Sequence, residues 1–356
     1  MRLRLLSGDA MRSRSLALLL VLVVAGLALA PFLFPGARAL DVAAKICVFI
    51  VLVASFDLLL GYTGIVSFAH TMFFGIGAYG VAIALTFEHA SWKFLALGSL
   101  AALATSLVLS LAIGLFSLRV RALFFAMITL AVASAFQRLA SQLSDLTGGE
   151  DGLNFTVPEW LQPGFMLRDD PLFGVDLGGR LISYYLVFCC AAILFLAMLR
   201  IVNSPFGRVL QAIRENDFRA EALGYRSVVY RTLSTVISAL FATMAGILLA
   251  IWLHYNGPNT SLSFEIMVDV LLIVVIGGMG TLYGSILGTT VFILAQSYLQ
   301  DIMRWISQAV APLPTIGSGL SALFSPDRWL LWLGILFVLC VYNFPNGIVG
   351  RLRQQR

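Results

Sequence analysis

The chain has 356 residues, of which 60% are hydrophobic and 12% are charged, and its formal net charge is +5. Ordinary soluble domains carry about 25% charged residues, so this composition excludes a soluble globular protein and predicts an all-α polytopic membrane protein. The arginines are dispersed over separate loops and form no single basic patch in the sequence, which argues against a nucleic-acid partner and points to membrane topology.

A membrane-spanning helix needs about 20 apolar residues to cross about 30 Å of hydrocarbon. Ten segments approach this requirement, so we predict one transmembrane domain over residues 1–356, surrounded by membrane lipid. In chain order the segments are Leu16–Phe34, Leu40–Leu60, Ile65–Phe87, Phe94–Ser117, Ala122–Ser141, Leu181–Leu199, Thr232–Leu253, Glu265–Ile276, Leu282–Leu299 and Trp329–Phe344. The eighth is too short to cross comfortably by itself.

Basic residues set the expected orientation. Most of the 23 Lys and Arg residues fall in segments that are cytoplasmic if the N-terminus lies inside, so both termini are predicted to be cytoplasmic. The N-terminal segment also resembles a signal peptide that ends at Ala37–Ala39. We favour its retention, because its apolar run is longer than usual and contains Pro31 and Pro35.

Two stretches combine many glycines with an absence of charge: Gly61–His70, which runs on to Tyr79, and Gly277–Gly284. Both fall where a cytoplasmic turn is predicted, and an exposed turn would normally carry arginine. Their neutrality favours backbone that is buried or lines a cavity, in hairpins that either cross or re-enter the membrane. Close helix packing through small residues is an equally weighted alternative for any single glycine. The residues predicted to line a translocation path are Gly61, Tyr62, Thr63, Gly64, Ser67, His70, Gly277, Gly278 and Gly280.

Ionisable residues inside spans are costly and are therefore candidates for function. For Asp57 and Asp269 we favour structural pairing or placement at the membrane interface over a proton relay, because no chain of carboxylates and histidines accompanies them. His70 is expected to be a satisfied core residue. The four cysteines show no metal-ligand spacing, so no metal site is predicted.

The predicted external loop, residues 144–180, is acidic and rich in turn residues. Two interpretations stay open for it: a docking surface for an external binding protein, or a solvated loop.

The longest polar interruption is the predicted cytoplasmic loop at residues 204–224. Ser204 can cap a helix with Pro205 at its first position, and Asp217 can cap a second short helix that Gly224 ends. In the first helix the apolar residues are Phe206, Val209, Leu210 and Ile213, and the polar ones are Arg208, Gln211, Arg214 and Glu215. The helix is therefore amphipathic, and its polar face is either a docking surface or a solvated loop that fixes topology.

Three motifs resemble the branched-chain amino acid permeases of ABC importers. They are Leu58–Tyr79, Ile276–Gly288 and the run Gly207–Gly224, which ends Ala220-Glu-Ala-Leu-Gly. Family members commonly have Gln at the position of Ile65 and Gly at that of Ala69, which leaves the substrate open. In that family a Glu-Ala-Ala-like segment followed by Gly rests in a groove of the cytoplasmic ATPase. The resemblance thus implies ATPase-coupling residues Arg208, Gln211, Arg214, Glu215, Glu221, Ala222 and Gly224.

The resemblance also implies a multi-pass subunit of a bacterial inner membrane importer that works by alternating access. Its expected partners are a homologous permease, two cytoplasmic ATPases that bind ATP and Mg, and an external substrate-binding protein. The substrate would be leucine, isoleucine or valine, and an amide or urea importer is the alternative.

The chain has no phosphate-binding loop of the Gly-x-x-x-x-Gly-Lys-Ser/Thr type and only two lysines, so we expect no ATPase site and no enzyme activity of its own. An ion-coupled secondary transporter would need a membrane carboxylate at a broken helix, for which Asp57 is the best candidate. A membrane-embedded enzyme is disfavoured because the histidines, at positions 70, 89 and 254, are scattered.

Overall fold

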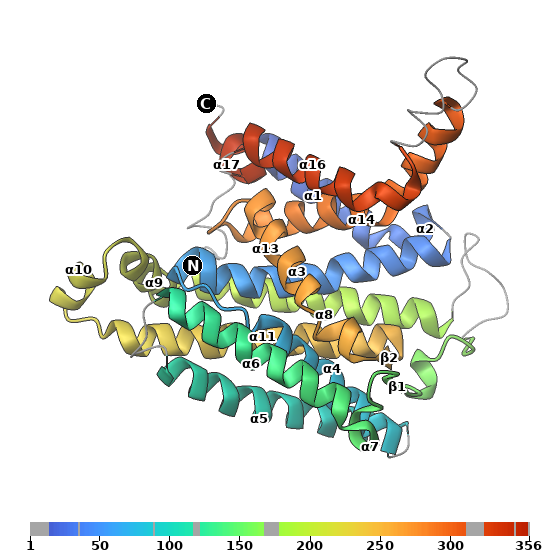
Figure 1. Ribbon diagram of the computed structural model, residues 1–356, viewed down its shortest axis with the longest axis horizontal. Coiled ribbons are helices and arrows are strands. Elements are labelled where there is room, and N and C mark those ends of the chain that lie inside the picture. Colours follow the sequence, from blue (N-terminus) through green and yellow to red (C-terminus); the bar gives the residue numbers. More distant parts are fainter. Residues whose placement is uncertain are drawn as a thin grey trace, which may run out of the picture.

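The computed structural model describes residues 14–34, 36–87, 90–116, 122–166, 178–310, 324–344 and 347–354. Helices dominate this part of the chain (Figure 1). The elements are α1 (Arg14–Ala28), α2 (Ala30–Leu33), α3 (Ala37–Thr63), α4 (His70–Phe87), α5 (Trp92–Phe116), α6 (Ala122–Gln142), α7 (Ser144–Thr147), β1 (Leu153–Asn154), η2 (Glu159–Leu161), α8 (Gly179–Val202), α9 (Pro205–Glu215), α10 (Asp217–Ala222), α11 (Ser227–Leu253), β2 (Tyr255–Asn256), α12 (Pro258–Ser261), α13 (Phe264–Gly277), α14 (Leu282–Val310), η3 (Pro326–Arg328), α16 (Trp329–Asn343) and α17 (Gly347–Gln354).

Nine helical segments of the described chain are long and apolar enough to cross a membrane, and α1 adds a shorter apolar helix. The polytopic all-α class is confirmed. Each of the ten predicted segments contains a helix, but the third, predicted as Ile65–Phe87, becomes helical only at His70. The eighth is short as predicted: α13 has 14 residues, and α12 before it extends the apolar segment to Pro258–Gly277.

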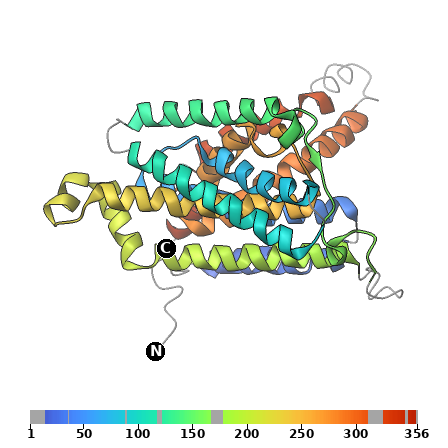
Figure 2. The same cartoon turned by 90° about the horizontal axis from the view of Figure 1, so that it is seen from below.

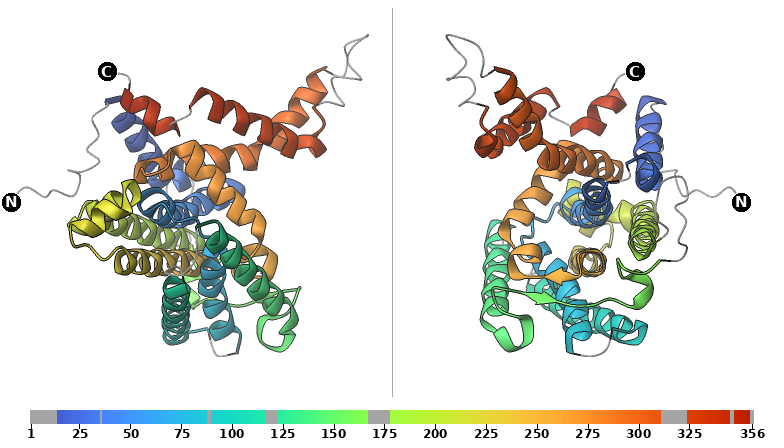
Figure 3. Two further views of the ribbon diagram at one scale, coloured as in Figure 1. Left: turned by 60° about the vertical axis from the view of Figure 1, so that its left-hand side comes forward. Right: turned by 90° about the vertical axis from the view of Figure 1, so that its right-hand side faces the viewer.

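Helix α3 lies at the centre of the bundle, as the view along the helices shows (Figure 3). It packs against α8, α11, α13 and α14, and 94% of its most apolar window is buried. A helix that is hydrophobic all round belongs in such a position. The corresponding windows of α5 and α6 are only 22% buried, so these helices present apolar surface outward.

The two ends of the bundle differ. At one end β1 and β2 form a short antiparallel pair, with Leu153 opposite Asn256. At the other end α9 and α10 project beyond the long helices (Figures 1 and 2). The α9–α10 end is the one at which α8 finishes and α11 begins.

The predicted external loop, residues 144–180, is built against the bundle in its described part. Gly148 and Gly152 have φ angles of +73° and +72°, and the absence of a Cβ atom on Gly152 lets the chain pass close to the backbone of Asn256. Residues 167–177 of this loop lie outside the described residues. Docking of a binding protein here stays a prediction.

Candidate coupling site

The segment 204–224 folds into two helices, as predicted. Ser204 occupies the position before α9 and Pro205 is its first residue, as predicted, but the Ser204 side chain does not cap the helix: its Oγ donates to the Ile201 carbonyl at 2.6 Å. The predicted cap of the second helix is wrong by one residue: Asn216 precedes α10, and its Oδ1 accepts from the Arg219 backbone N–H at 2.9 Å. Asp217 instead pairs with a side chain of α11.

Two contacts tie α10 to the start of α11. The carboxylate of Asp217 lies 3.1 Å from the Arg231 guanidinium, and Ser227 Oγ donates to the Glu221 carboxylate. Gly224 has a φ angle of +91°, a conformation that glycine adopts at no steric cost. Contacts within the chain therefore connect α10 to the start of α11.

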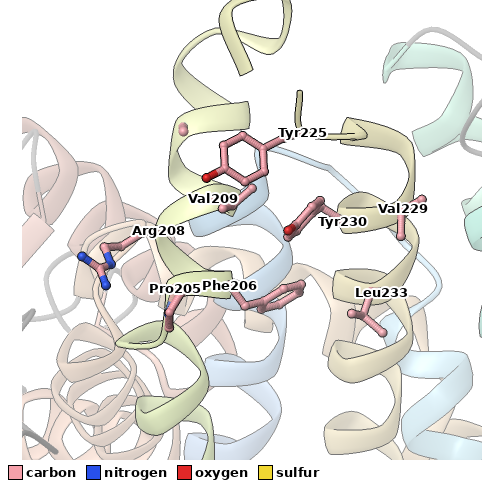
Figure 4. A pocket seen from close by; sticks show the side chains of 9 residues that line it. Pro205, Phe206, Arg208, Val209, Tyr225, Val229, Tyr230 and Leu233 are labelled. Atoms are coloured by element: carbon pink, nitrogen blue, oxygen red, sulfur yellow. The ribbon is translucent and has the colours of Figure 1, made fainter. Parts of the chain in front are cut away.

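The amphipathic pattern of α9 is confirmed. Leu210 and Ile213 are buried, whereas Phe206 and Val209 are partly exposed and line a groove between α9 and the start of α11 (Figure 4). Tyr225, Val229, Tyr230 and Leu233 also line it, and its volume is about 690 Å³. The rings of Phe206 and Tyr230 stack across the groove, with centroids 5.7 Å apart.

The polar residues of α9 do not all face outward. Gln211 and Glu215 are exposed, and Arg208 is exposed beside the groove. The sequence placed Arg214 on the same outer surface, yet its guanidinium turns back toward the bundle and donates to the Gly61 carbonyl. Arg214 as a whole is nevertheless exposed.

Sequence reasoning missed two exposed apolar side chains near the tip of this region. Phe218 is 87% exposed and Leu223 is 72% exposed. The sequence could have indicated the exposure of Phe218, because the short helix 217–222 has no apolar face that would bury this side chain. Exposed apolar side chains beside charged Arg219 and Glu221 mark a candidate contact surface.

The first glycine-rich turn begins where α3 ends. Gly64 adopts the left-handed conformation with a φ angle of +75°, as glycine commonly does at the end of a helix. The backbone N–H groups of Gly64 and Ile65 donate to the Leu60 and Leu59 carbonyls, both at 3.2 Å. Residues 65–69 are not helical, so the predicted break is confirmed.

The second glycine-rich turn, between α13 and α14, lies against the first. The Gly280 backbone N–H donates to Asp57 Oδ1 at 2.8 Å. A Cβ atom on Gly61 would overlap both Asp57 Oδ1 and the Gly280 backbone nitrogen. Asp57 is 1% exposed, and its contact with the Gly280 backbone is the kind that a structural role requires. The preference for a structural role over a proton relay stays a prediction. Asp269 likewise accepts from Gln296 Nε2 at 3.2 Å.

The second turn is also packed on its other sides. Gly277 faces the backbone of Gly284 so closely that a Cβ atom on Gly277 would overlap the Gly284 carbonyl. Gly347, at the start of α17, lies against the backbone of Gly278 in the same way. Gly277 and Gly278 therefore serve close backbone packing in this structure.

The remaining side chains of the predicted path, Tyr62, Thr63 and Ser67, are buried. Thr63 and Ser67 also form hydrogen bonds. Thr63 Oγ1 and Ser234 Oγ are 2.8 Å apart, which joins α3 to α11. Tyr62 is 1% exposed, and Ser67 Oγ accepts from the Ala69 backbone N–H at 3.3 Å. A role for these residues in translocation stays a prediction.

His70 is a satisfied core residue, as expected. Its Nε2 lies 3.2 Å from both Ser55 Oγ and Ser238 Oγ. Ser55 Oγ donates its hydrogen to the Leu52 carbonyl and Ser238 Oγ donates to the Ser55 carbonyl, so both oxygens can only accept from the ring. The hydrogen-bond network therefore assigns the proton of the neutral imidazole to Nε2, and His70 joins α3, α4 and α11.

The site thus consists of a projecting helix pair and a junction of two glycine-rich turns. We use "turn junction" for Asp57, Gly61, Gly64, Gly278 and Gly280. Arg214 connects the helix pair to the turn junction. Among the described residues no group of three or more His, Cys, Asp or Glu side chains could hold a metal ion.

Comparisons with known proteins agree with this architecture. The family described as "Branched-chain amino acid transport system / permease component" matches residues 38–341. Two relatives are high-affinity branched-chain amino acid transport system permease proteins named LivM. The Escherichia coli protein is 28% identical over 96% of this chain and 75% of its own length. The Salmonella typhimurium protein is 27% identical over 88% of this chain and 71% of its own length.

A third relative, the permease protein BraD of Pseudomonas aeruginosa, is 26% identical over 83% of this chain and 89% of its own length. No solved structure matches the chain. The family match covers both glycine-rich turns and the segment 204–224, the regions that form the site described above. This chain is a multi-pass membrane protein that belongs to the family of branched-chain amino acid transport system permease components.

Proposed function

We propose that the chain is the permease subunit of an ABC importer that carries leucine, isoleucine or valine across the bacterial inner membrane. The relatives' names supply the substrate class. A second permease, two cytoplasmic ATPases and an external binding protein complete the importer. In this arrangement both termini are cytoplasmic and the α9–α10 end faces the ATPases.

The observation that carries the proposal is the projection of α9 and α10 with Phe218 and Leu223 exposed on it. The neighbouring residues Arg219 and Glu221 are charged and exposed, so this surface lies in water and not in lipid. Exposing two large apolar side chains to water is unfavourable by about 25 cal/mol per Å². A partner that buries them would gain that free energy on docking, and a cytoplasmic ATPase is such a partner.

ATP and Mg would be bound by the ATPase subunits, because this chain has no phosphate-binding loop. Their movement would act on the segment 204–224 and change access to a path near the turn junction. Of the path residues predicted from the sequence, Tyr62, Thr63 and Ser67 are the polar side chains closest to the first break, whereas Gly277 and Gly278 pack backbone against backbone. The permease itself performs no covalent chemistry.

The docking role can be tested by changing Phe218 to Asp. The chain should be made and inserted normally, because the side chain is 87% exposed, but it should no longer co-purify with the ATPases encoded beside it. Phe218→Leu is the matched control, since it keeps the apolar surface and should retain the complex. Normal co-purification and uptake by Phe218→Asp would contradict the proposal.

Substrate identity needs a separate test, because the residues at positions 65 and 69, Ile65 and Ala69, differ from the common family pattern. The binding protein from the same gene cluster should bind leucine, isoleucine or valine by calorimetry. Binding of urea or a short amide in their place would assign the importer to the alternative class.

A further inference from the structure

The end of α3 has an unusual capping group. The last four carbonyls of an α-helix lack partners within the helix, so other donors must satisfy them. The backbone N–H groups after α3 reach the carbonyls of Leu59 and Leu60, whereas the carbonyl of Gly61 accepts from Arg214. This donor comes from a residue 153 positions away, on the helix that projects from the bundle.

Arg214 touches both glycine-rich turns. Its Cγ would lie 3.2 Å from a Cβ atom on Gly64, and its Nη1 would lie 3.0 Å from one on Gly280. A Cβ atom at either position would crowd the Arg214 side chain, and both glycines also have positive φ angles, +75° at Gly64 and +79° at Gly280. A guanidinium at the C-terminal end of α3 is also favourable electrostatically, because that end of a helix carries partial negative charge.

Asp57 holds the second turn to the same face of α3. Residues four apart in a helix lie one above the other, so Asp57 and Gly61 face the same way. Asp57 accepts the Gly280 N–H at 2.8 Å, and Gly61 presents its carbonyl to Arg214. Both turns and α9 are therefore joined within two turns of one central helix.

We propose that Arg214 is a positioning residue that carries movement of α9 into both glycine-rich turns at once. The inference rests on the function proposed above, since it concerns how ATPase movement reaches the translocation path. Leu210 and Ile213 bury the apolar face of α9 against the bundle. Arg214 adds a charge-assisted hydrogen bond to the Gly61 carbonyl at the turn junction. When α9 shifts, the Gly61 carbonyl must move with Arg214. If the two separated, the buried carbonyl oxygen would lose its hydrogen-bond donor, which is energetically costly.

The test compares Arg214→Met with Arg200→Met in the reconstituted importer with all its partners. Methionine keeps an unbranched apolar stem but removes the donor, and Arg200 is an exposed arginine at the end of α8. Leucine uptake and ATP hydrolysis are measured in the same proteoliposomes. Arg214→Met should assemble and hydrolyse ATP, while leucine carried per ATP falls at least about tenfold, the factor expected from losing one charge-assisted hydrogen bond. Arg200→Met should match the wild type.

Hydrogen exchange on the purified chain separates this inference from the proposed function, because it needs neither ATP nor substrate. In Arg214→Met the peptides covering 57–66 and 276–284 should exchange faster together, and in Arg200→Met neither should change. An unchanged ratio of leucine to ATP in Arg214→Met would overturn the inference, as would exchange that rises in only one turn. Loss of ATPase binding with normal exchange would also overturn it, since Arg214 would then be a docking residue.

Discussion

The turn after α3 and the turn between α13 and α14 are both rich in glycine, yet they meet their surroundings differently. Gly64 in the first turn is exposed and has the flexible stem of Arg214 as its neighbour. Gly277 in the second turn is buried and faces the backbone of Gly284. A side chain can move aside, but backbone within a packed helix pair cannot.

The difference separates two uses of glycine in a membrane bundle. At the second turn, glycine allows helices to approach closely, which is how small residues stabilise membrane helices. At the first turn, glycine supplies a left-handed residue that ends the helix beside a contact from α9. We therefore expect a side chain at Gly277 to affect assembly and a side chain at Gly64 to affect transport.

The largest effect is expected for Gly277→Leu. A Cβ atom alone would overlap the Gly284 carbonyl, so the helices α13 and α14 would have to separate. Overpacking of this kind costs about 3 kcal/mol, and the yield and melting temperature of the detergent-purified chain should fall. Gly334→Leu is the control, since nothing lies within 4 Å of that position. Equal stability of the two variants would remove the distinction between the turns.

Gly64→Leu should reduce stability less than Gly277→Leu does, and it should reduce leucine uptake more. The left-handed conformation costs a non-glycine residue about 1–2 kcal/mol, and the new side chain would push against Arg214. The complex with the ATPases should form, but leucine uptake should fail.

Gly64→Asn provides the control, because asparagine tolerates the left-handed region better than other residues. It should recover part of the uptake. Uptake and complex melting are measured side by side, and a misassembled Gly64→Leu complex would place the first turn with the second as a packing element.

At Asp57, where the two turns touch, the loss of stability should depend on the substitution. Asp57→Asn keeps an acceptor for the Gly280 N–H and should cost about 1 kcal/mol, whereas Asp57→Ala leaves that donor buried and should cost about 2–3 kcal/mol. Melting temperatures check the order. If Asp57→Asn abolished uptake while melting normally, the carboxylate would have a proton-linked role and the structural account would be wrong.

The smallest effect is expected for Ser234→Ala, which removes the hydroxyl contact with Thr63. Such contacts between membrane helices contribute about 0.6 kcal/mol on average. A double-mutant cycle with Thr63→Val, read as melting temperature, should give a coupling of that size. A coupling several times larger would show that the start of the first turn is held as firmly as the second.

Local features of the site could be read from the sequence. The amphipathic spacing in α9 placed Leu210 and Ile213 inward, and the neutral Gly61–Gly64 stretch marked the break at the end of α3. The misplaced cap shows the limit of such reading, because Asn216 and Asp217 are both good capping residues and only the backbone decides between them.

Contacts between distant segments could not be predicted. Asp57 and Gly280 are 223 residues apart, and Arg214 meets Gly61 across 153 residues. An arginine on the polar face of a predicted loop helix is expected to face solvent. The neighbouring sequence does not indicate that the Gly61 carbonyl lies within hydrogen-bonding distance. The three-dimensional arrangement alone reveals that it reaches the bundle.

We propose that transport through this chain is driven by ATP hydrolysed on partner subunits. The most direct measurement is leucine uptake into proteoliposomes that contain either the complete importer or the two permeases alone, with ATP supplied and ion gradients collapsed by ionophores. We predict uptake and ATP hydrolysis by the complete importer, and neither by the permeases alone. A second set of the same proteoliposomes receives a proton or sodium gradient and no ATP, and leucine uptake by the permeases alone under that condition would contradict ATP-driven transport.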